Sequence, residues 1–87
     1  MELDEFEIGK DFECSGKTYR CTDIGSRSVV AIRVDRVETQ TRHEDTTTRR
    51  VLDRWRADAE GWFRGPPYAI LEMVFDEEDL ELCTLAT

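Results

Sequence analysis

The stretch SVVAIRVDRV, residues 28–37, decides the fold class. It is dense in β-branched residues, which favour strands because they fit a pleated surface. Successive side chains of a strand point to opposite sides, so one side of this stretch carries Val30, Ile32 and Val34. The pattern predicts a buried strand over residues 28–37 in a mainly β protein.

Two further strands are predicted upstream, over residues 6–12 and 17–22, because apolar and polar residues alternate there. Gly9 indicates a bend within the first of them. The letters CSGK at 14–17 predict a hairpin turn between the two strands, since glycine readily adopts positive φ. The break before the third strand is DIGSR, residues 23–27, where aspartate and glycine favour a turn.

The polar stretch ETQTRHEDTTTRR, residues 38–50, contains no large apolar residue and adds little to a core. Two alternatives stay open for it. Its threonines are compatible with a polar hairpin that turns near residues 43–45. The same stretch can instead hold the start of a helix capped by Thr46, Thr47 or Thr48.

Residues 51–63 show the spacing of one helix face. The apolar residues of that face are Val51, Leu52, Trp55, Ala59 and Trp62. Gly61 is predicted to end this helix as a C-terminal cap. The letters GPP at 65–67 then force a turn, because proline cannot continue a helix.

A central strand is predicted over residues 68–75, with apolar residues alternating along it. Asp76 is predicted to cap a turn or a single helical turn through Leu80. The strand candidates and the helix of residues 51–63 together predict a mainly β (or α+β) fold. We expect a small antiparallel sheet or an SH3-like barrel of about five strands with one short helix. A chain of 87 residues is expected to form one domain.

The charge of the chain is concentrated at its two ends. The net charge is −8, residues 1–13 hold six acids and one lysine, and residues 76–87 hold five acids and no base. If the two ends meet in space, they form one acidic face. This charge argues against general nucleic-acid binding, which needs Lys and Arg to replace condensed counterions. It fits a well-solvated surface, a basic protein partner, or competition with nucleic acid for a basic groove.

The cysteines Cys14, Cys21 and Cys83 are an odd number without the spacing of a secreted disulfide framework. Residues 1–13 lack the apolar region of a signal peptide, and no apolar run approaches the ~18 residues of a membrane span. We therefore expect a cytoplasmic protein with free thiols and no membrane segment. A disulfide between Cys14 and Cys21 across the hairpin is disfavoured.

No pattern in the sequence predicts a cofactor or a metal. Zinc is disfavoured because the three cysteines and His43 lack a close Cys-x2-Cys pair. Calcium is disfavoured because the acids at 76–79 lack the spaced ligands of a calcium loop. Glu72 and His43 remain as candidates for acid–base chemistry. Alternation places Glu72 on the solvent side of its strand, so an enzyme is not predicted.

Two stretches resemble a known family. CTDIGSRSVVAI (21–32) and GPPYAILEMVFDEEDLELC (65–83) look like a family of small uncharacterised bacterial proteins, mostly proteobacterial. The resemblance covers residues 19–34 and 61–83. It implies no catalytic residue, and nothing is carried onto residues 35–60.

The leading hypothesis is a protein-interaction module that binds a basic protein surface and is itself a monomer or homodimer. Its candidate site joins two aromatic residues beside the double-proline corner to four consecutive acids: Trp62, Tyr68, Asp76, Glu77, Glu78 and Asp79. The aromatic residues can line a groove for a partner. They can equally pack in the core, which is favoured because the chain has few other large residues to bury.

Two other functions are kept as alternatives. The first is a nucleic-acid mimic, an inhibitor carried by a phage or mobile element, which occupies the basic groove of a nucleic-acid-binding protein. Mimicry requires rows of carboxylates near the spacing of phosphates, about 6–7 Å along one strand. The second is an enzyme in which Glu72 and His43 share one pocket.

Overall fold

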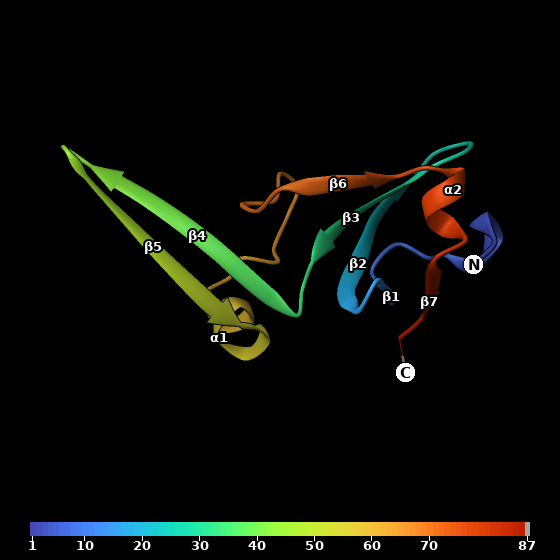
Figure 1. Cartoon of the computed structure of the whole chain (residues 1–87), viewed down its shortest axis with the longest axis horizontal. Coiled ribbons are helices and arrows are strands. Elements are labelled where there is room, and N and C mark those ends of the chain that lie inside the picture. The colour runs from blue at the N-terminus through green and yellow to red at the C-terminus, as the bar shows by residue number, and fades with distance from the viewer. Residues whose placement is uncertain (87) are drawn as a thin grey trace.

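A computed structural model describes residues 1–86 and shows a mainly β protein (Figure 1). These residues form an antiparallel five-stranded sheet in the order β6-β3-β2-β1-β7, a two-stranded ribbon of β4 and β5, and two short α-helices. The strands are β1 (Asp11–Cys14), β2 (Lys17–Ile24), β3 (Val29–Arg33), β4 (Arg36–His43), β5 (Thr46–Asp53), β6 (Glu72–Phe75) and β7 (Cys83–Leu85). The helices are α1 (Arg54–Ala59) and α2 (Glu77–Leu80), and a 3-10 turn covers Leu3–Glu5.

The predicted mainly β class is confirmed, in its form as a small antiparallel sheet. Within residues 1–86 the sheet is open between its edge strands β6 and β7, so no barrel closes. The same residues hold seven strands instead of about five, and a second helix. Neither helix has the length and apolar character needed to cross a lipid bilayer.

The first hairpin turns where CSGK predicts it. Cys14 pairs with Lys17, and the loop residues Ser15 and Gly16 both have positive φ, 52° and 78°. A two-residue loop of this kind matches the twist of the strands that it joins.

The strand predicted over residues 6–12 is wrong in its bounds, since β1 begins at Asp11. Gly9 bends the chain at φ 89°, and its N–H donates to the Cys21 carbonyl at 2.8 Å. The bend leaves Phe6 buried in the core and Ile8 exposed to solvent, although strand spacing would put both on one side. The glycine therefore separates the N-terminal segment from the sheet.

The stretch 28–37 is two strands instead of one. β3 ends at Arg33, and β4 starts at Arg36 as part of the ribbon. Asp35 lies between them, and its carboxylate accepts hydrogen bonds from Arg33 Nε at 2.6 Å and from the Arg36 N–H at 3.0 Å. Such local side-chain bonds compete with sheet pairing, which explains why the strand stops here.

β3 carries two hydrophobic cores, one on each face. The first core joins one face of the sheet to the N-terminal segment and α2, and comprises Phe6, Phe12, Cys14, Tyr19, Cys21, Val29, Ala31, Phe75, Leu80 and Cys83. The second core lies between β3, the base of the ribbon and α1, and comprises Ile32, Val34, Val37, Leu52, Ala57 and Phe63. The two cores thus share a single strand.

The ribbon of β4 and β5 projects from the body of the molecule (Figure 1). Its strands pair from Arg36 with Asp53 to His43 with Thr46, and Glu44 has φ 52° in the turn. The hairpin alternative for the polar stretch is correct, and a helix capped at Thr46 to Thr48 is wrong. The base of the ribbon is buried, while its outer half is exposed because it carries no apolar residue.

Helix α1 is shorter than the helix predicted over residues 51–63. Val51 and Leu52 belong to β5, and Asp53 caps the helix by accepting from the Arg56 N–H at 2.8 Å. The predicted apolar face is also wrong, since Trp55 is 78% exposed.

The C-terminal end of α1 follows the prediction for Gly61. Gly61 has φ 83°, its N–H donates to the Asp58 carbonyl, and the Trp62 N–H donates to the Ala57 carbonyl. These two bonds form the Schellman motif, in which a left-handed glycine ends a helix.

Strand β6 is half as long as the predicted strand 68–75, and it lies at the edge of the sheet instead of its centre. Asp76 then caps α2 as predicted. Its carboxylate accepts from the N–H groups of Glu78 and Asp79, and the Asp79 carboxylate accepts from the Asp76 N–H. This reciprocal arrangement is a capping box.

Candidate functional site

The two acidic ends of the chain lie side by side (Figure 1). The Met1 nitrogen donates hydrogen bonds to the carbonyl oxygens of Leu80 at 2.7 Å and Cys83 at 3.1 Å. Leu3 packs against the first core, to which Leu80 also belongs. The condition for one acidic face, that the ends meet in space, is therefore fulfilled.

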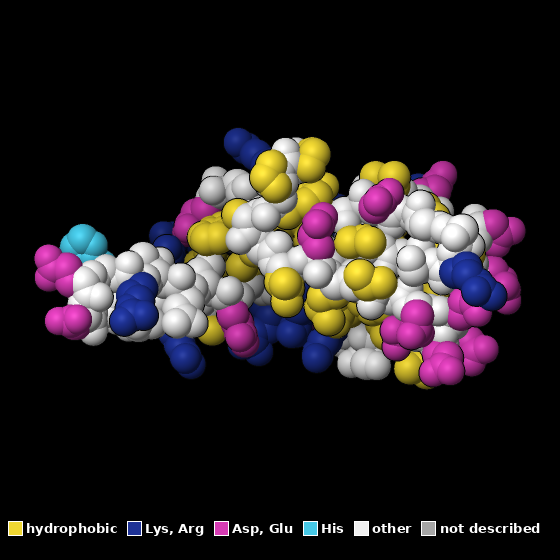
Figure 2. Space-filling model, turned by 90° about the horizontal axis from the view of Figure 1, so that it is seen from above, with side chains coloured by type: hydrophobic (Ala, Val, Ile, Leu, Met, Phe, Trp, Pro, Cys, Tyr) yellow, Lys and Arg dark blue, Asp and Glu magenta, His cyan; other side chains and the backbone are white. Residues whose placement is uncertain are grey.

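We call the resulting surface the acidic end. Its members are the acids of residues 1–7 and 76–81: Glu2, Asp4, Glu5, Glu7, Asp76, Glu77, Glu78, Asp79 and Glu81. Asp79 is half-buried and the others are exposed. Figure 2 shows acidic side chains gathered at this end of the molecule.

Two bases partly offset this charge. Arg27 Nε donates to Glu77 at 3.2 Å, and Lys10 forms an ion pair with Glu7. A pocket of about 270 Å³ lies where the N-terminal segment meets α2, with Glu2 and Glu81 among its lining residues. The acidic end is thus a slightly hollowed surface with an excess of carboxylates.

The four acids predicted as site residues have different roles. Asp76 and Asp79 are engaged in the capping box, and Glu77 pairs with Arg27. Glu78 is exposed, and no side-chain bond within residues 1–86 engages its carboxylate. Glu2 and Glu81 were missed as individual site residues, although the uneven charge of the sequence already pointed to their segments.

The aromatic half of the predicted site lies elsewhere. Trp62 and Tyr68 are half-buried and pack against the second core. Trp62 Nε1 donates to Glu60 at 3.3 Å. The Tyr68 ring covers Gly65 so closely that a Cβ there would lie 2.7 Å from ring atoms. This corner packs on the second core, whereas Leu80 of α2 belongs to the first core, so the structure does not bring the two halves together.

Glu72 and His43 do not share a pocket either. His43 ends β4 at the tip of the ribbon, roughly 23 Å from Arg36 at ~3.3 Å per residue. Glu72 begins β6 on the body of the molecule (Figure 1). The pair that the enzyme hypothesis requires is not assembled.

Cys14 and Cys83 face each other as register partners of β1 and β7, and both are buried free thiols. Burial, together with the hydrogen bond to Cys14, raises the pKa of Cys83 to about 12. Burial also raises the pKa of Cys21. Across residues 1–86, no three His, Cys, Asp or Glu side chains are placed to hold a metal ion.

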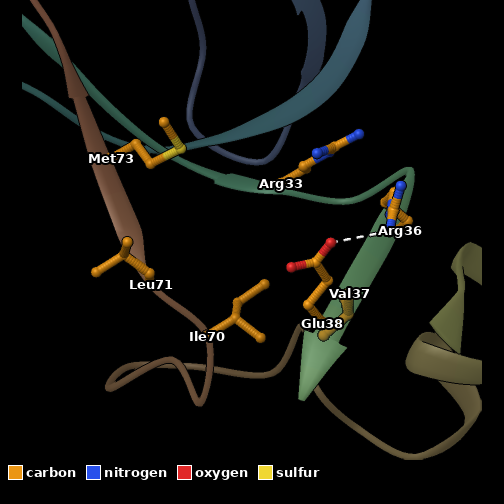
Figure 3. A pocket seen from close by; sticks show the side chains of 7 residues that line it. All are labelled: Arg33, Arg36, Val37, Glu38, Ile70, Leu71 and Met73. Carbon is orange, nitrogen blue, oxygen red and sulfur yellow. Dashed lines mark hydrogen bonds and ion pairs between the residues drawn. The ribbon is translucent and has the colours of Figure 1, made fainter. Parts of the chain in front are cut away.

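An apolar pocket of about 320 Å³ lies between the sheet and the ribbon (Figure 3). It is lined by Arg33, Arg36, Val37, Glu38, Ile70, Leu71 and Met73. The arginines are balanced locally, because Arg33 pairs with Asp35 and Arg36 pairs with Glu38 at 2.8 Å. Burial alone would raise the pKa of Asp35, but the hydrogen bond from Arg33, the charge of Arg33 and the backbone hydrogen bonds of Thr18 and Arg36 together outweigh it and lower that pKa.

The structure therefore offers two surfaces of different character, the acidic end and the apolar pocket beside β6. No protein-family model, curated protein or solved structure matches this chain, and the resemblance of residues 21–32 and 65–83 to a bacterial family stays a prediction.

Proposed function

We propose that this protein is an interaction module that binds a basic partner protein through its acidic end. One observation carries the proposal: the hydrogen bonds from Met1 to Leu80 and Cys83 hold two acidic segments together. Each segment alone is a short charged stretch. Joined, they concentrate negative charge on one surface, which steers and accelerates the approach of a basic partner.

The cost of this arrangement supports a binding role. Like charges held close together repel one another and destabilise the folded chain. Within residues 1–86 the acidic end has only Arg27 and Lys10 paired with its acids. The ribbon, by contrast, distributes arginines among its acids. A charge cluster kept in spite of repulsion is typical of a surface that meets an opposite charge.

The test is a capture experiment from a native lysate with two charge-reversal variants. The first carries Glu2→Lys, Glu78→Lys and Glu81→Lys, which change the acidic end without touching the capping box. The matched control carries Glu38→Lys, Glu44→Lys and Asp45→Lys on the ribbon, with the same change in net charge. We expect basic partners to be lost from the first variant and kept by the control.

Salt provides a second criterion. Contacts between exposed charges weaken as the ionic strength rises, because the Debye length falls from about 8 Å at 0.15 M to about 3 Å at 1 M. Binding through the acidic end should therefore weaken steadily with salt. Equal capture by both variants, or no basic partner at any salt concentration, would rule out the proposal.

The same experiment addresses mimicry of a nucleic acid. In that case the partner is a nucleic-acid-binding protein, and added DNA or RNA displaces the chain from it. Two of the four acids, Asp76 and Asp79, are engaged in the capping box of α2. A mimic would therefore have to present its row of carboxylates from the remaining acids, Glu78 and Glu81 among them.

A further inference from the structure

β6 leaves one edge of the five-stranded sheet open. Within residues 1–86 it pairs only with β3, so its far edge bonds to no strand. An open edge presents backbone N–H and C=O groups that can pair with another chain. Natural edges are usually protected by short length, charged side chains, proline or a bulge; β6 contains no lysine, proline or bulge, and its protection is limited to its short length and the charge of Glu72.

Three apolar side chains in and beside β6 are exposed. Leu71 is 82% exposed, Val74 66% and Met73 40%. Figure 3 shows Leu71 and Met73 beside the apolar pocket, and Figure 2 shows apolar side chains gathered in the middle of this face. Leu71 and Met73 line the same pocket, whereas Val74 points to the other face of the strand. Exposed apolar residues that are neighbours in space, such as Leu71 and Met73, mark an interaction surface.

We propose that β6 pairs with β6 of a second copy of this chain, antiparallel about a two-fold axis at Met73. Two five-stranded sheets then join into one. Side chains opposite each other in such a pair point to the same face. Met73 therefore meets Met73 of the second copy, Leu71 meets its Phe75, and Glu72 meets its Val74.

The charges beside β6 favour this register. An axis at Val74 would keep the alternation of faces but would set Glu72 opposite Asp76 of the second copy. Like charges directly opposite each other destabilise a strand pair. An axis at Met73 instead sets the apolar Val74 of the second copy opposite Glu72.

The charges beside β6 also favour the antiparallel direction, and in that direction they are compatible with a second copy as the occupant. The C-terminal end of β6 runs into the four acids 76–79, whereas at its N-terminal end Arg33 and Arg36 balance the nearby acids. An antiparallel pair sets each acidic end against the balanced end of the other copy. A parallel pair would set acid against acid. β6 of a second copy has an acidic C-terminal end and a balanced N-terminal end, so each can lie opposite the other kind of end in the first copy.

The dimer is expected to be weak and to strengthen with salt. A four-residue strand offers a small interface compared with the ~1,600 Å² of a standard one. Both copies carry a net charge of −8, so they repel each other in dilute buffer. Salt screens this repulsion. Salt is expected to strengthen the dimer but to weaken the binding of a basic partner at the acidic end. The two proposals are therefore tested separately, and either can fail without the other.

The test is analytical ultracentrifugation of the full chain over a wide range of concentration, at low and high salt. We expect the mass to rise from one chain to two with concentration, at lower concentration in high salt. Met73→Lys sets two lysines opposite each other and should weaken the dimer about tenfold, ~1.4 kcal/mol. Val74→Lys, one residue further on, sets each lysine opposite Glu72 and should weaken it less.

Leu82→Lys is the matched control, because Leu82 is an exposed apolar residue outside β6. It should leave the dimer unchanged, and circular dichroism checks that each variant folds. A chain that stays monomeric up to its solubility limit overturns the proposal. So does a dimer whose dissociation constant is unchanged by Met73→Lys, or one that Val74→Lys weakens as much as Met73→Lys.

Discussion

Glu60 accepts hydrogen bonds from three residues just beyond α1. Its carboxylate accepts from Arg56 Nε at 2.7 Å, Arg50 Nη2 at 3.1 Å and Trp62 Nε1 at 3.3 Å. These donors favour the charged carboxylate and lower the pKa of Glu60 to about 2. One side chain thereby links the ribbon, the helix and the aromatic corner.

This pKa predicts how Glu60 contributes to stability as the pH changes. The folded pKa of about 2 lies below the ordinary value of 4.5, so the contribution is complete above pH 4.5 and is lost as the pH falls towards 2. Glu60→Gln should therefore make the free energy of unfolding fall less steeply over this range. A carboxyl NMR titration measures the pKa directly, and a midpoint near 4.5 would contradict the prediction.

The hydrogen-bond partners of charged side chains such as Glu60 are hard to predict from the sequence. Asp11 accepts from Arg20 Nε at 2.8 Å and from Arg54 Nη2 at 2.7 Å, and Arg20 also lies 5.7 Å from the centre of the Phe63 ring. Asp11 and Arg54 are 43 positions apart in the chain. The sequence shows that acids and arginines alternate with apolar residues, but folding decides which of them meet.

At the scale of elements, Asp76 offers a test of helix capping. Asp76→Ala removes the acceptor for two N–H groups of α2 and should lower the free energy of unfolding by about 1 kcal/mol. Asp76→Asn removes the same charge but keeps an acceptor, so it should cost less. Urea unfolding measures both. Equal losses in the two variants would show that charge, and not the cap, determines the stability of this element.

The elements set by local rules were the ones predicted correctly from the sequence. The turn at 14–17, the end of α1 at Gly61 and the cap at Asp76 each depend on a few neighbouring residues. The bounds of strands were predicted less well, because alternation does not show where a partner strand stops. The stretch 28–37 alternates throughout, yet Asp35 divides it between the sheet and the ribbon.

The ribbon should be dispensable for folding in its outer half. Thr39 and Arg50 are register partners, and the ten residues between them are exposed and carry no large apolar side chain. Replacing residues 40–49 by an Asn-Gly turn should therefore change the free energy of unfolding by less than about 1 kcal/mol. Urea unfolding of the shortened chain tests this. A loss of several kcal/mol would mean that the outer ribbon packs on the body.

On the scale of the whole molecule, the two proposed interaction surfaces adjoin each other at the C-terminal end of β6. The chain measures 45 × 24 × 22 Å, and its long axis runs from the ribbon tip to the acidic end (Figure 1). The open edge of β6 lies between these extremes. A partner at the acidic end and a second copy at β6 would both contact the C-terminal end of β6, so each is expected to influence the binding of the other.

The two cores should nevertheless unfold as one unit, because β3 contributes Ala31 to the first core and Ile32 to the second. Trp62 reports on the second core by fluorescence once Trp55→Phe has removed the exposed indole. Cys83 reports on the first core, since a buried thiol with a pKa of about 12 resists alkylation until the core opens. We expect the two signals to change at the same urea concentration.

Ile32→Ala makes this test stringent. It truncates a fully buried side chain of the second core and should cost about 2–5 kcal/mol. If the cores are coupled through β3, alkylation of Cys83, read by peptide mass spectrometry, should shift to lower urea together with Trp62 fluorescence. A variant in which Trp62 reports unfolding while Cys83 stays protected would show two independent units. Since the Val29–Arg33 backbone pairs with strands on both sides, opening one face removes support from the other, and a joint transition is the expected result.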